Sequence, residues 1–437
     1  MPLKRELGLR DLTLFAIACI VGPRWLSTAA HAGPGSLLLW LLAAVLFLIP
    51  LSIAVAVLTA KNPAAGGLYR WTHADFGPWH GFLAFWTYWV GIAFWFPSAA
   101  MFYASIVLEP LGRTGDRKWI LIVSLAMIWL ALGTNLVGVS IGKWTESAGA
   151  LASWVMAALL MMAAWLVWRR VGVATSFHVL PSAHWETVNF WSTIAYGMTG
   201  IEAAAFMGSE MRNPGRDMPR AAWISSAFIT IFYVGSTAAL MVIRSPDQIS
   251  ELSGLAQVST TAGNLLHAAW IAPAMVLLVL LTAIGQFGGL GSSVSRMPFA
   301  AGADHLLPSA FARVHRRWNT PYVSMLAFGV LASLLLIAVQ IGDTMRAAYQ
   351  TLVSLMVMTG FFSYIYLFGS AWKAGRRWTA VAGQAITALA LICSVAPTDE
   401  IRNVGLFELK LLGGTAAVVL TGWLIYRRYA PRQTALT

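Results

Sequence analysis

One short stretch of this 437-residue chain places a permanent positive charge inside a run of apolar residues. The stretch reads IACIVGPRWLSTAAHAG, with Gly-Pro-Arg at positions 22–24. Arginine is always charged and holds a carboxylate through two parallel hydrogen bonds, while proline breaks a helix because it has no N–H group. At such a break we expect free N–H groups around Trp25 and Leu26 to attract a carboxylate, and carbonyl groups near Val21 to accept hydrogen bonds from an ammonium group.

A second stretch, WSTIAYGMTGIEAAAFMGSE, places a carboxyl group inside another apolar run. The carboxyl group is that of Glu202, and Tyr196, Gly197 and Thr199 precede it with further carbonyl acceptors. The two stretches together suit a zwitterionic amino acid. Three roles are open: Arg24 holds a substrate carboxylate, Glu202 carries a proton because apolar surroundings disfavour its ionised form, or the two residues form a structural ion pair.

The composition predicts a membrane protein in which both stretches lie at bilayer depth. Hydrophobic residues make up 58% of the chain and charged residues 11%. Apolar runs of about 20 residues, enough to cross a hydrocarbon core of about 30 Å, recur along the whole sequence, so the lipid bilayer is an expected partner. The predicted twelve spans are 12–31, 36–60, 80–110, 119–140, 145–168, 188–209, 220–243, 266–296, 321–341, 346–369, 379–396 and 405–427.

Lysine and arginine are concentrated in alternate loops, which predicts the orientation of the spans. Most of them fall on the side that holds both termini, as the positive-inside rule requires of the cytoplasmic side. We therefore expect a multi-pass protein of the inner (plasma) membrane with cytoplasmic N and C termini. The net charge of +12 follows from this bias and does not indicate nucleic-acid binding. Cys19 and Cys393 fall inside predicted spans, which indicates no disulfide framework, and no metal or cofactor is expected.

The positions of the two interrupted spans predict an inverted repeat. They are the first and the sixth, so each opens a half of five spans, and such paired breaks are typical of transporters with a substrate site between the halves. We expect one transmembrane transporter domain over 1–437, with repeat one at about 10–170, repeat two at about 186–370 and accessory helices at about 378–428.

Two further features of the spans are candidates for function. The third span contains FLAFWTYWVGIAFWFP, whose aromatic side chains crowd around Gly91 and could line a pocket. Arg296 lies near the inner face before Met-Pro, where it either has a buried role or extends to the interface.

Taken together, these motifs resemble the amino acid/polyamine/organocation (APC) superfamily, and within it the amino acid permeases. The resemblance rests on sequence segments that extend from the N terminus through the ninth span. They are YGMTGIE followed by MGSEMRNPGRDMPRA at 207–221, NPAAGGLYRWTHADFGPWHGFLAFW at 62–86, TNLVGV at 134–139 and GSSVSRMPFAAGADHLLPSAFARVHRRWNTP at 291–321. The resemblance implies an all-α membrane protein with a LeuT-like 5+5 inverted repeat, spans 1 and 6 broken, and twelve transmembrane helices in total.

The resemblance also shows where this chain departs from its family. Family members typically carry Gly-Ser-Gly in the first break, whose amides hold the substrate carboxylate, whereas this chain has Gly22, Pro23 and Arg24. Pro23 offers no N–H and Arg24 prevents close backbone approach, so we expect the guanidinium to replace the missing amide or to hold Glu202.

Three serines bear on the ion that drives transport. Some proton-driven members carry a lysine in span 5, at the position that aligns with Ser153, which puts that route in doubt here. A sodium site built from span 1 carbonyls and the hydroxyls of Ser292 or Ser293 becomes conceivable. The resemblance further implies that Tyr196 forms an aromatic gate.

The sequence therefore predicts a secondary-active amino acid transporter that works by alternating access, through proton-coupled symport or exchange. A fixed cation in the first break favours neutral or acidic L-amino acids. The alternatives are a carrier of a related amine or organic acid, a sodium-coupled amino acid symporter, and, from another class, a non-transporting membrane sensor. No nucleophile with a neighbouring base and no paired intramembrane carboxylates indicate an enzyme.

Overall fold

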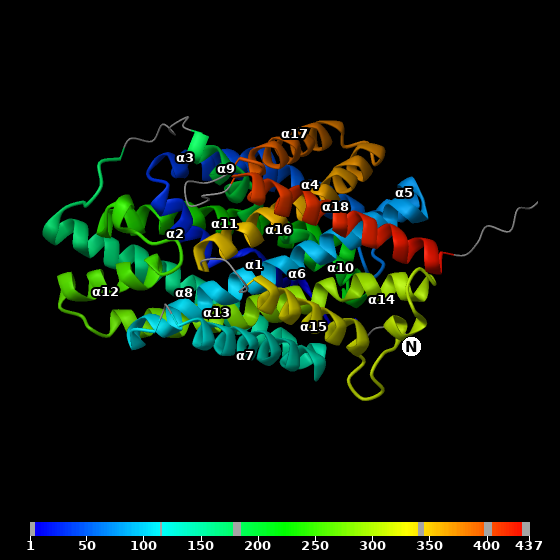
Figure 1. Cartoon of the computed structure of the whole chain (residues 1–437), viewed down its shortest axis with the longest axis horizontal. Helices are drawn as coiled ribbons and strands as arrows, with labels where there is room; N and C mark the ends of the chain where they lie inside the picture. Colours follow the sequence, from blue (N-terminus) through cyan, green and yellow to red (C-terminus); the bar gives the residue numbers. More distant parts are fainter. Residues whose placement is uncertain (1–4, 114–115, 178–184, 340–344, 397–403, 431–437) are drawn as a thin grey trace, which may run out of the picture.

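The computed structural model describes residues 5–113, 116–177, 185–339, 345–396 and 404–430 as a bundle of helices that run along one long axis (Figure 1). Within these residues the chain forms no extended sheet, and its one β-bridge joins Leu7 to Met211. The prediction of an all-α protein is confirmed. The last two residues of the ninth predicted span lie outside the described residues.

The bounds of the α-helices follow in chain order. They are α1 (Leu9–Ile20), α2 (Pro23–His31), α3 (Gly35–Ala43), α4 (Ile49–Lys61), α5 (Leu68–Phe76), α6 (Pro78–Leu108), α7 (Arg117–Leu136), α8 (Val139–Val171), α9 (Trp185–Gly197), α10 (Ile201–Phe206), α11 (Pro214–Ile243), α12 (Gly254–Leu266), α13 (Ile271–Val294), α14 (Arg296–Ala303), α15 (Tyr322–Val339), α16 (Met345–Lys373), α17 (Arg377–Ser394) and α18 (Val404–Tyr429). A π-helical turn at Ala44–Leu48 joins α3 to α4.

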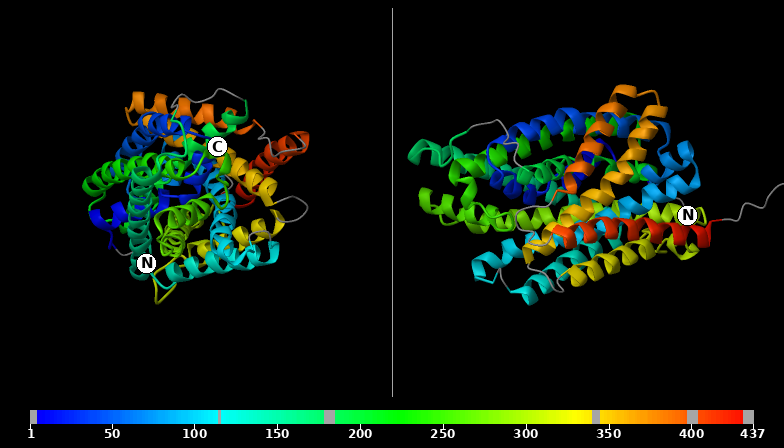
Figure 2. Two further views of the ribbon diagram at one scale, coloured as in Figure 1. Left: turned by 90° about the vertical axis from the view of Figure 1, so that its left-hand side faces the viewer. Right: turned by 45° about the horizontal axis from the view of Figure 1, so that its top comes forward.

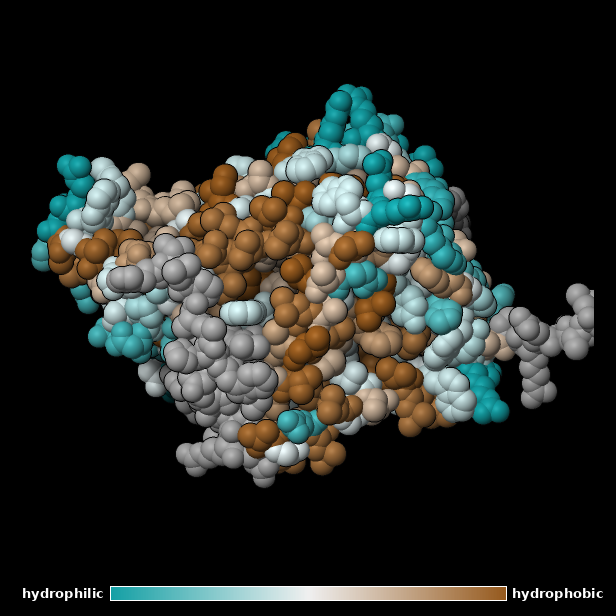
Figure 3. Space-filling view, turned by 90° about the horizontal axis from the view of Figure 1, so that it is seen from above, coloured by the Kyte–Doolittle hydropathy of each residue, from teal (hydrophilic) through white to brown (hydrophobic). Residues whose placement is uncertain are grey.

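The surface carries the pattern expected of a membrane protein. On the face seen in Figure 3, apolar side chains cover the middle of the bundle, and polar side chains gather toward both ends. Among the described helices, 8 are individually long and apolar enough to cross a bilayer, and the bent pair α1–α2 makes a ninth span. The count of twelve spans remains a prediction.

The first break lies where the sequence predicts it. Helix α1 ends at Ile20 and α2 begins at Pro23, with the two helix axes bent by 42°. Val21 and Gly22 between them have extended backbone, at φ −66°, ψ 105° and φ −115°, ψ 104°. Proline suits the first position of a helix because the N–H group that it lacks would have no helical partner there. The same residue that ends one helix therefore starts the next.

The second break lies in the sixth predicted span. Helix α9 ends at Gly197 and α10 begins at Ile201. Gly200 has φ +122°, a conformation that other residues rarely adopt, so glycine is required at this turn. The prediction that both spans are broken is confirmed.

Helix α6 forms the centre of the bundle, and α17 and α18 lie on its outside (Figure 2). In the apolar window of α6, 94% of the residues are buried, against 17% in that of α18. Gly91 lets α6 approach α16 closely, since a Cβ atom there would lie 3.0 Å from the Gly360 nitrogen and 3.1 Å from the Thr359 hydroxyl. This position is a helix crossing.

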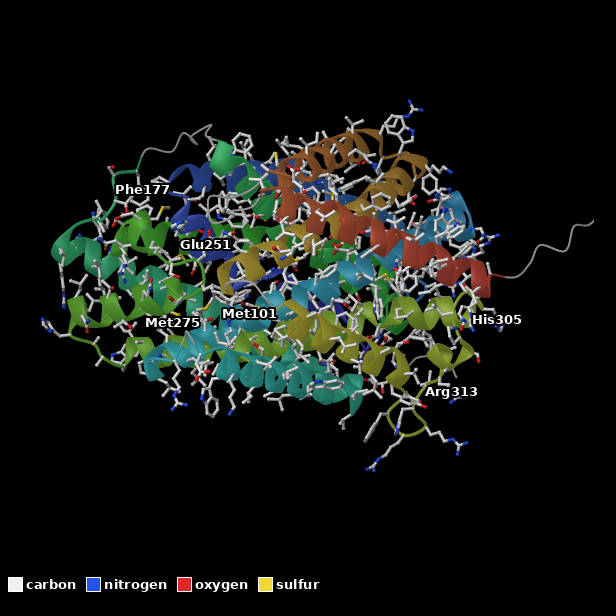
Figure 4. All side chains as sticks on the ribbon, in the orientation of Figure 1. Met101, Phe177, Glu251, Met275, His305 and Arg313 are labelled. Carbon is white, nitrogen blue, oxygen red and sulfur yellow. The ribbon has the colours of Figure 1, made fainter. Side chains whose placement is uncertain are left out.

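The loops gather at the two ends of the bundle. The N terminus lies at the same end as His305 and Arg313, and Phe177 and Glu251 lie toward the other end (Figures 1 and 4). We call these the N-terminal end and the outer end. The N-terminal end holds segments that the sequence assigns to the cytoplasm.

Candidate functional site

One tyrosine hydroxyl spans the break in the first span. Tyr233 of α11 donates a hydrogen bond to the Ile20 carbonyl oxygen at 2.8 Å and accepts one from the Gly22 N–H at 3.1 Å. Its ring stacks on Trp40 of α3 with centroids 4.3 Å apart. The break is therefore held in a fixed shape by groups from two other helices, as a pre-formed site requires.

The carbonyl groups released near Val21 also have partners. The Gln286 amide of α13 donates to the Val21 oxygen at 3.0 Å and to the Cys19 oxygen at 3.3 Å. The Tyr103 hydroxyl of α6 in turn donates to the Gln286 side-chain oxygen at 2.6 Å, which orients the amide. These carbonyls, expected to bind an ammonium group, already accept hydrogen bonds from the protein.

Arg24 is a buried cation in polarisable surroundings, with 1% of its surface exposed. Its guanidinium donates to the Ser98 hydroxyl at 2.5 Å and to the Met356 sulfur at 3.4 Å, while its Nε atom has no partner. The guanidinium carbon lies 3.9 Å from the Trp25 ring centroid and 5.2 Å from that of Trp95. Aromatic faces and a thioether stabilise a cation weakly compared with a carboxylate.

Within the described residues no ion pair joins Arg24 to Glu202, so one of the three roles considered for them is not realised in this structure. A buried charge without a counter-ion costs several kcal/mol in general. Arg24 keeps donors available and lacks an anionic partner, and it therefore forms the strongest anion-binding feature of the break.

Glu202 is satisfied by neutral donors. Its Oε1 accepts hydrogen bonds from the hydroxyls of Tyr88 and Tyr364, both at 2.6 Å, and its Oε2 accepts the Gly200 N–H at 3.1 Å. The side chain is fully buried at the start of α10. It thus locks the second break to α6 and α16.

The space between the two breaks is occupied by Trp25. A Cβ atom at Gly22 would lie 2.8 Å from its Cδ1, and one at Gly197 would lie 3.5 Å from the same atom. The Tyr196 ring is next to it, at a centroid distance of 6.4 Å, and covers Gly360 on α16. The structure therefore brings together residues from both predicted breaks around one indole ring.

The other predicted site residues form their hydrogen bonds with nearby residues of their own span, or are simply buried. The Thr199 hydroxyl donates to the Tyr196 carbonyl at 2.7 Å, and Leu26 is fully buried in α2. The hydroxyls of Ser153, Ser292 and Ser293 donate to the carbonyls of Ala150, Gly289 and Leu290, at 2.7, 3.3 and 3.0 Å.

A cavity of about 270 Å³ lies on the outer side of α2, and its lining includes Tyr349, His31 and Glu251 (Figure 4). The His31 ring nitrogen contacts the Ile249 carbonyl at 2.9 Å, which ties α2 to the loop before α12. Tyr349 lies two helical turns before Met356, the residue that contacts Arg24. The cavity therefore lies against α16, two helical turns from the residue that contacts the guanidinium.

The N-terminal end is closed by ion pairs. Arg296 is 1% exposed, so it does not extend to the interface, and its Nε donates to Glu210 at 2.9 Å while Nη1 donates to the Ser292 carbonyl at 2.5 Å. Arg70 of α5 pairs with Asp304 at 2.6 Å. Burial and the hydrogen bond to Asp304 raise the pKa of the neighbouring Tyr69, which stays a neutral donor.

Several residues of the site could not be identified from the sequence. Tyr233, Gln286, Tyr103 and Tyr88 are single polar residues in apolar helices, where a packing role is the ordinary one. The sequence contains one signal for them: a polar side chain inside an apolar span must find a hydrogen-bond partner there. The sequence does not say which of the two breaks supplies that partner.

Two broken spans that face each other across a buried charge, inside a bundle with an apolar belt, define a membrane transporter. Comparison with known proteins identifies the kind of transporter. The family model described as amino acid permease matches residues 7–396, so the chain belongs to the amino acid permease family and is an amino acid transporter. This confirms the resemblance found in the sequence motifs.

Individual relatives agree with this assignment. The chain is 25% identical to an uncharacterized transporter of Legionella pneumophila, over 98% of this chain and 97% of the relative. It is 23% identical to the serine/threonine exchanger SteT of Bacillus subtilis, over 84% of each. The crystal structure of MhsT in complex with L-phenylalanine matches 98% of this chain and 100% of that one, with a TM-score of 0.60 and 14% identity. That likeness establishes the fold, which is LeuT-like.

Proposed function

We propose that this protein is a secondary-active carrier of neutral or acidic L-amino acids that works by alternating access. The observation that carries the proposal is the buried guanidinium of Arg24, which has hydrogen-bond donors available and no carboxylate partner among the described residues. A substrate carboxylate would supply the missing negative charge in a site that excludes water. Such charge-assisted pairs are among the stronger hydrogen bonds in proteins.

The same feature predicts which substrates are excluded. A lysine or arginine substrate would bring a second cation toward a fixed one, and in the described structure Glu202 contacts Tyr88 and Tyr364 and does not pair with Arg24. A simple amine without a carboxylate gains nothing from Arg24. The carboxylate of a neutral or acidic amino acid would be recognised at Arg24, next to the indole of Trp25.

An organic acid without an amino group is the second candidate. It is favoured by the hydrogen bonds from Gln286 and Tyr233 that already occupy the carbonyls of Val21 and Ile20, where an ammonium group was expected. The carbonyl of Tyr196 also accepts a hydrogen bond, from Thr199. Each carbonyl oxygen has a second lone pair, so an ammonium group still has acceptors, and the amino acid remains the first candidate.

Proton-coupled symport or exchange is proposed over sodium coupling. A sodium ion between α1 and α13 would need the carbonyl oxygens of α1, and the NH₂ group of Gln286, which repels cations, already lies 3.0 and 3.3 Å from two of them. The hydroxyls of Ser292 and Ser293 donate to carbonyls of their own helix. We further propose a plasma-membrane location with cytoplasmic termini, and the division into two repeats and accessory helices set out above.

The test uses the purified full-length protein. Its thermal stability is measured with neutral, acidic and cationic amino acids, with their carboxamides, and with organic acids, because a ligand that binds the folded state raises its melting temperature. We expect neutral or acidic L-amino acids to stabilise it and their carboxamides to fail. Stabilisation by cationic amino acids or polyamines alone would contradict the proposal, and stabilisation by organic acids alone would select the second candidate.

A further inference from the structure

A second buried carboxyl group lies outside the site described above. Glu146 belongs to α8, and 4% of its surface is exposed. Its Cγ atom lies 3.6 Å from the point where Gly289 of α13 would carry a Cβ atom, and the sulfur of Cys19 in α1 lies 3.0 Å from the same point. Glu146 therefore sits where α1, α8 and α13 meet, next to the last turn of α1 before its break.

The helices pack unusually closely beside it. A Cβ atom on Gly149 of α8 would lie 2.8 Å from the Gly285 Cα atom of α13, so no larger residue fits either position. Glu146 is three residues before Gly149 and shares its helix face. On the α1 side, Phe15 and Cys19 are both buried. Glu146 therefore lies buried at a close contact of three helices.

Glu146 differs from the other buried glutamates in having no donor. Glu202 accepts three hydrogen bonds and Glu210 accepts two from Arg296. None of the hydrogen bonds found among the described residues reaches the Glu146 carboxyl group. A carboxyl group in apolar surroundings and without donors is stable in its neutral form.

The charged and titratable groups that face Glu146 do not reverse this. They are Arg296, Glu210 and Asp11, with the Cys19 thiol beside it. Arg296 is the one cation of this set, and its guanidinium is already bonded to Glu210 and to the Ser292 carbonyl. Asp11 accepts the Gly8 N–H at 3.0 Å and adds a further negative charge. The set thus contains one cation, Arg296, which is bonded to Glu210, and two carboxylates besides Glu146.

We propose that Glu146 is the proton-binding group that couples proton movement to substrate transport in this carrier. Its carboxyl group holds a proton while α1 is packed against α8 and α13. When α1 turns about the extended residues Val21 and Gly22 and opens the N-terminal end, water reaches Glu146, its O–H bond breaks and the proton passes to water. The inference rests on the proposed transport function, and it names the coupling group for that function.

This proposal gives protonation a defined energetic role. A proton on Glu146 favours the closed arrangement of α1, and loss of the proton favours the open one, because an ionised carboxylate in the closed arrangement would be buried without a partner. For one proton to cross with each substrate, Glu146 takes up its proton from the outer side before the site closes, and releases it on the N-terminal side when α1 opens.

The test compares Glu146→Gln with wild type and with Glu109→Gln, a control outside the helix core. Proteoliposomes with the membrane potential clamped are given a gradient of one pH unit, which supports about tenfold accumulation of substrate for one proton per cycle. We expect wild type and the control to accumulate substrate, and Glu146→Gln to lose accumulation while still exchanging labelled for unlabelled substrate above empty liposomes. Unchanged accumulation in Glu146→Gln, or substrate exchange by wild type without any response to the pH gradient, would overturn the proposal.

A second measurement needs no substrate. Infrared difference spectra of wild type, recorded as the pH is raised, should contain a protonated carboxylic acid band that is missing from Glu146→Gln. An identical band in both proteins would refute the role of Glu146. If no amino acid is transported by wild type, the proposed function fails, and the infrared result still decides whether Glu146 binds a proton. If Glu146→Gln does not fold, exchange by wild type without any response to the pH gradient still overturns the proposal.

Discussion

Replacing Arg24 by methionine separates its role in binding from its effect on stability. Methionine has a similar length and fits between the Trp25 and Trp95 rings and Met356. A hydrogen bond to a charged group contributes about 1.5–3 kcal/mol, so losing the guanidinium should weaken binding of amino acids by about 10- to 150-fold. The substitution should not weaken binding of the corresponding carboxamides.

Stability should change in the opposite direction. The guanidinium is buried, one of its nitrogen atoms has no partner and no carboxylate pairs with it in the described structure. An apolar replacement removes this uncompensated charge, so the melting temperature without ligand should stay the same or rise. A protein that gains stability while losing ligand affinity identifies a residue retained for binding.

The assay is thermal stabilisation and labelled uptake for wild type, Arg24→Met and a matched control. Arg113→Met is suitable because Arg113 also lies over a tryptophan, Trp119, at 5.1 Å, but on the exposed surface. The control should behave as wild type. Equal affinity of Arg24→Met and wild type for amino acids, or a large loss of stability in Arg24→Met without ligand, would show that Arg24 is structural.

Three further substitutions test the breaks and the closed end. Glu202→Gln should lower the free energy of unfolding by about 1–3 kcal/mol, because one amide group cannot accept hydrogen bonds from the Gly200 N–H and from both tyrosine hydroxyls. The substitution should also alter the pH dependence of uptake. An unchanged melting temperature and unchanged uptake would contradict this prediction. Gly200→Ala should also destabilise the protein, by about 1–3 kcal/mol, since φ +122° is strained for alanine, whereas Gly215→Ala on α11, where a Cβ atom meets no neighbour, should be tolerated. Glu210→Gln should cost about 3–5 kcal/mol by leaving Arg296 without its carboxylate, and adding Arg296→Met should restore part of the loss; a double variant no more stable than Glu210→Gln would refute the pairing argument.

The sequence was sufficient to place both breaks, because proline and glycine act locally on the backbone. Pro23 has no N–H group whatever surrounds it, and Gly200 adopts a positive φ that few residues can. The same holds for the helical class, which follows from the length of the apolar runs. The family motifs then supplied the expected arrangement of the two halves.

The partners of the charged residues could not be predicted in the same way. Arg24 and Glu202 lie in matched breaks, which made an ion pair conceivable, but each finds its contacts on α6 and α16 instead. Partner choice depends on the rotation of every neighbouring helix, and the sequence of one span does not contain it. The burial of Glu146 could not be predicted either, because a carboxylate near the start of a span ordinarily faces the membrane interface. The small residues that follow it, SAGA, do indicate a closely packed helix face.

The indole ring of Trp25 fills the space between the two breaks, where a substrate would bind. Because the ring rests against the glycine of each break, an arriving molecule cannot be enclosed until this side chain has swung aside. The size of the substrate that the carrier accepts then depends on how far this ring moves. Replacing Trp25 by phenylalanine or leucine should broaden the range of transported side chains, while Ser98 and Met356 still hold Arg24.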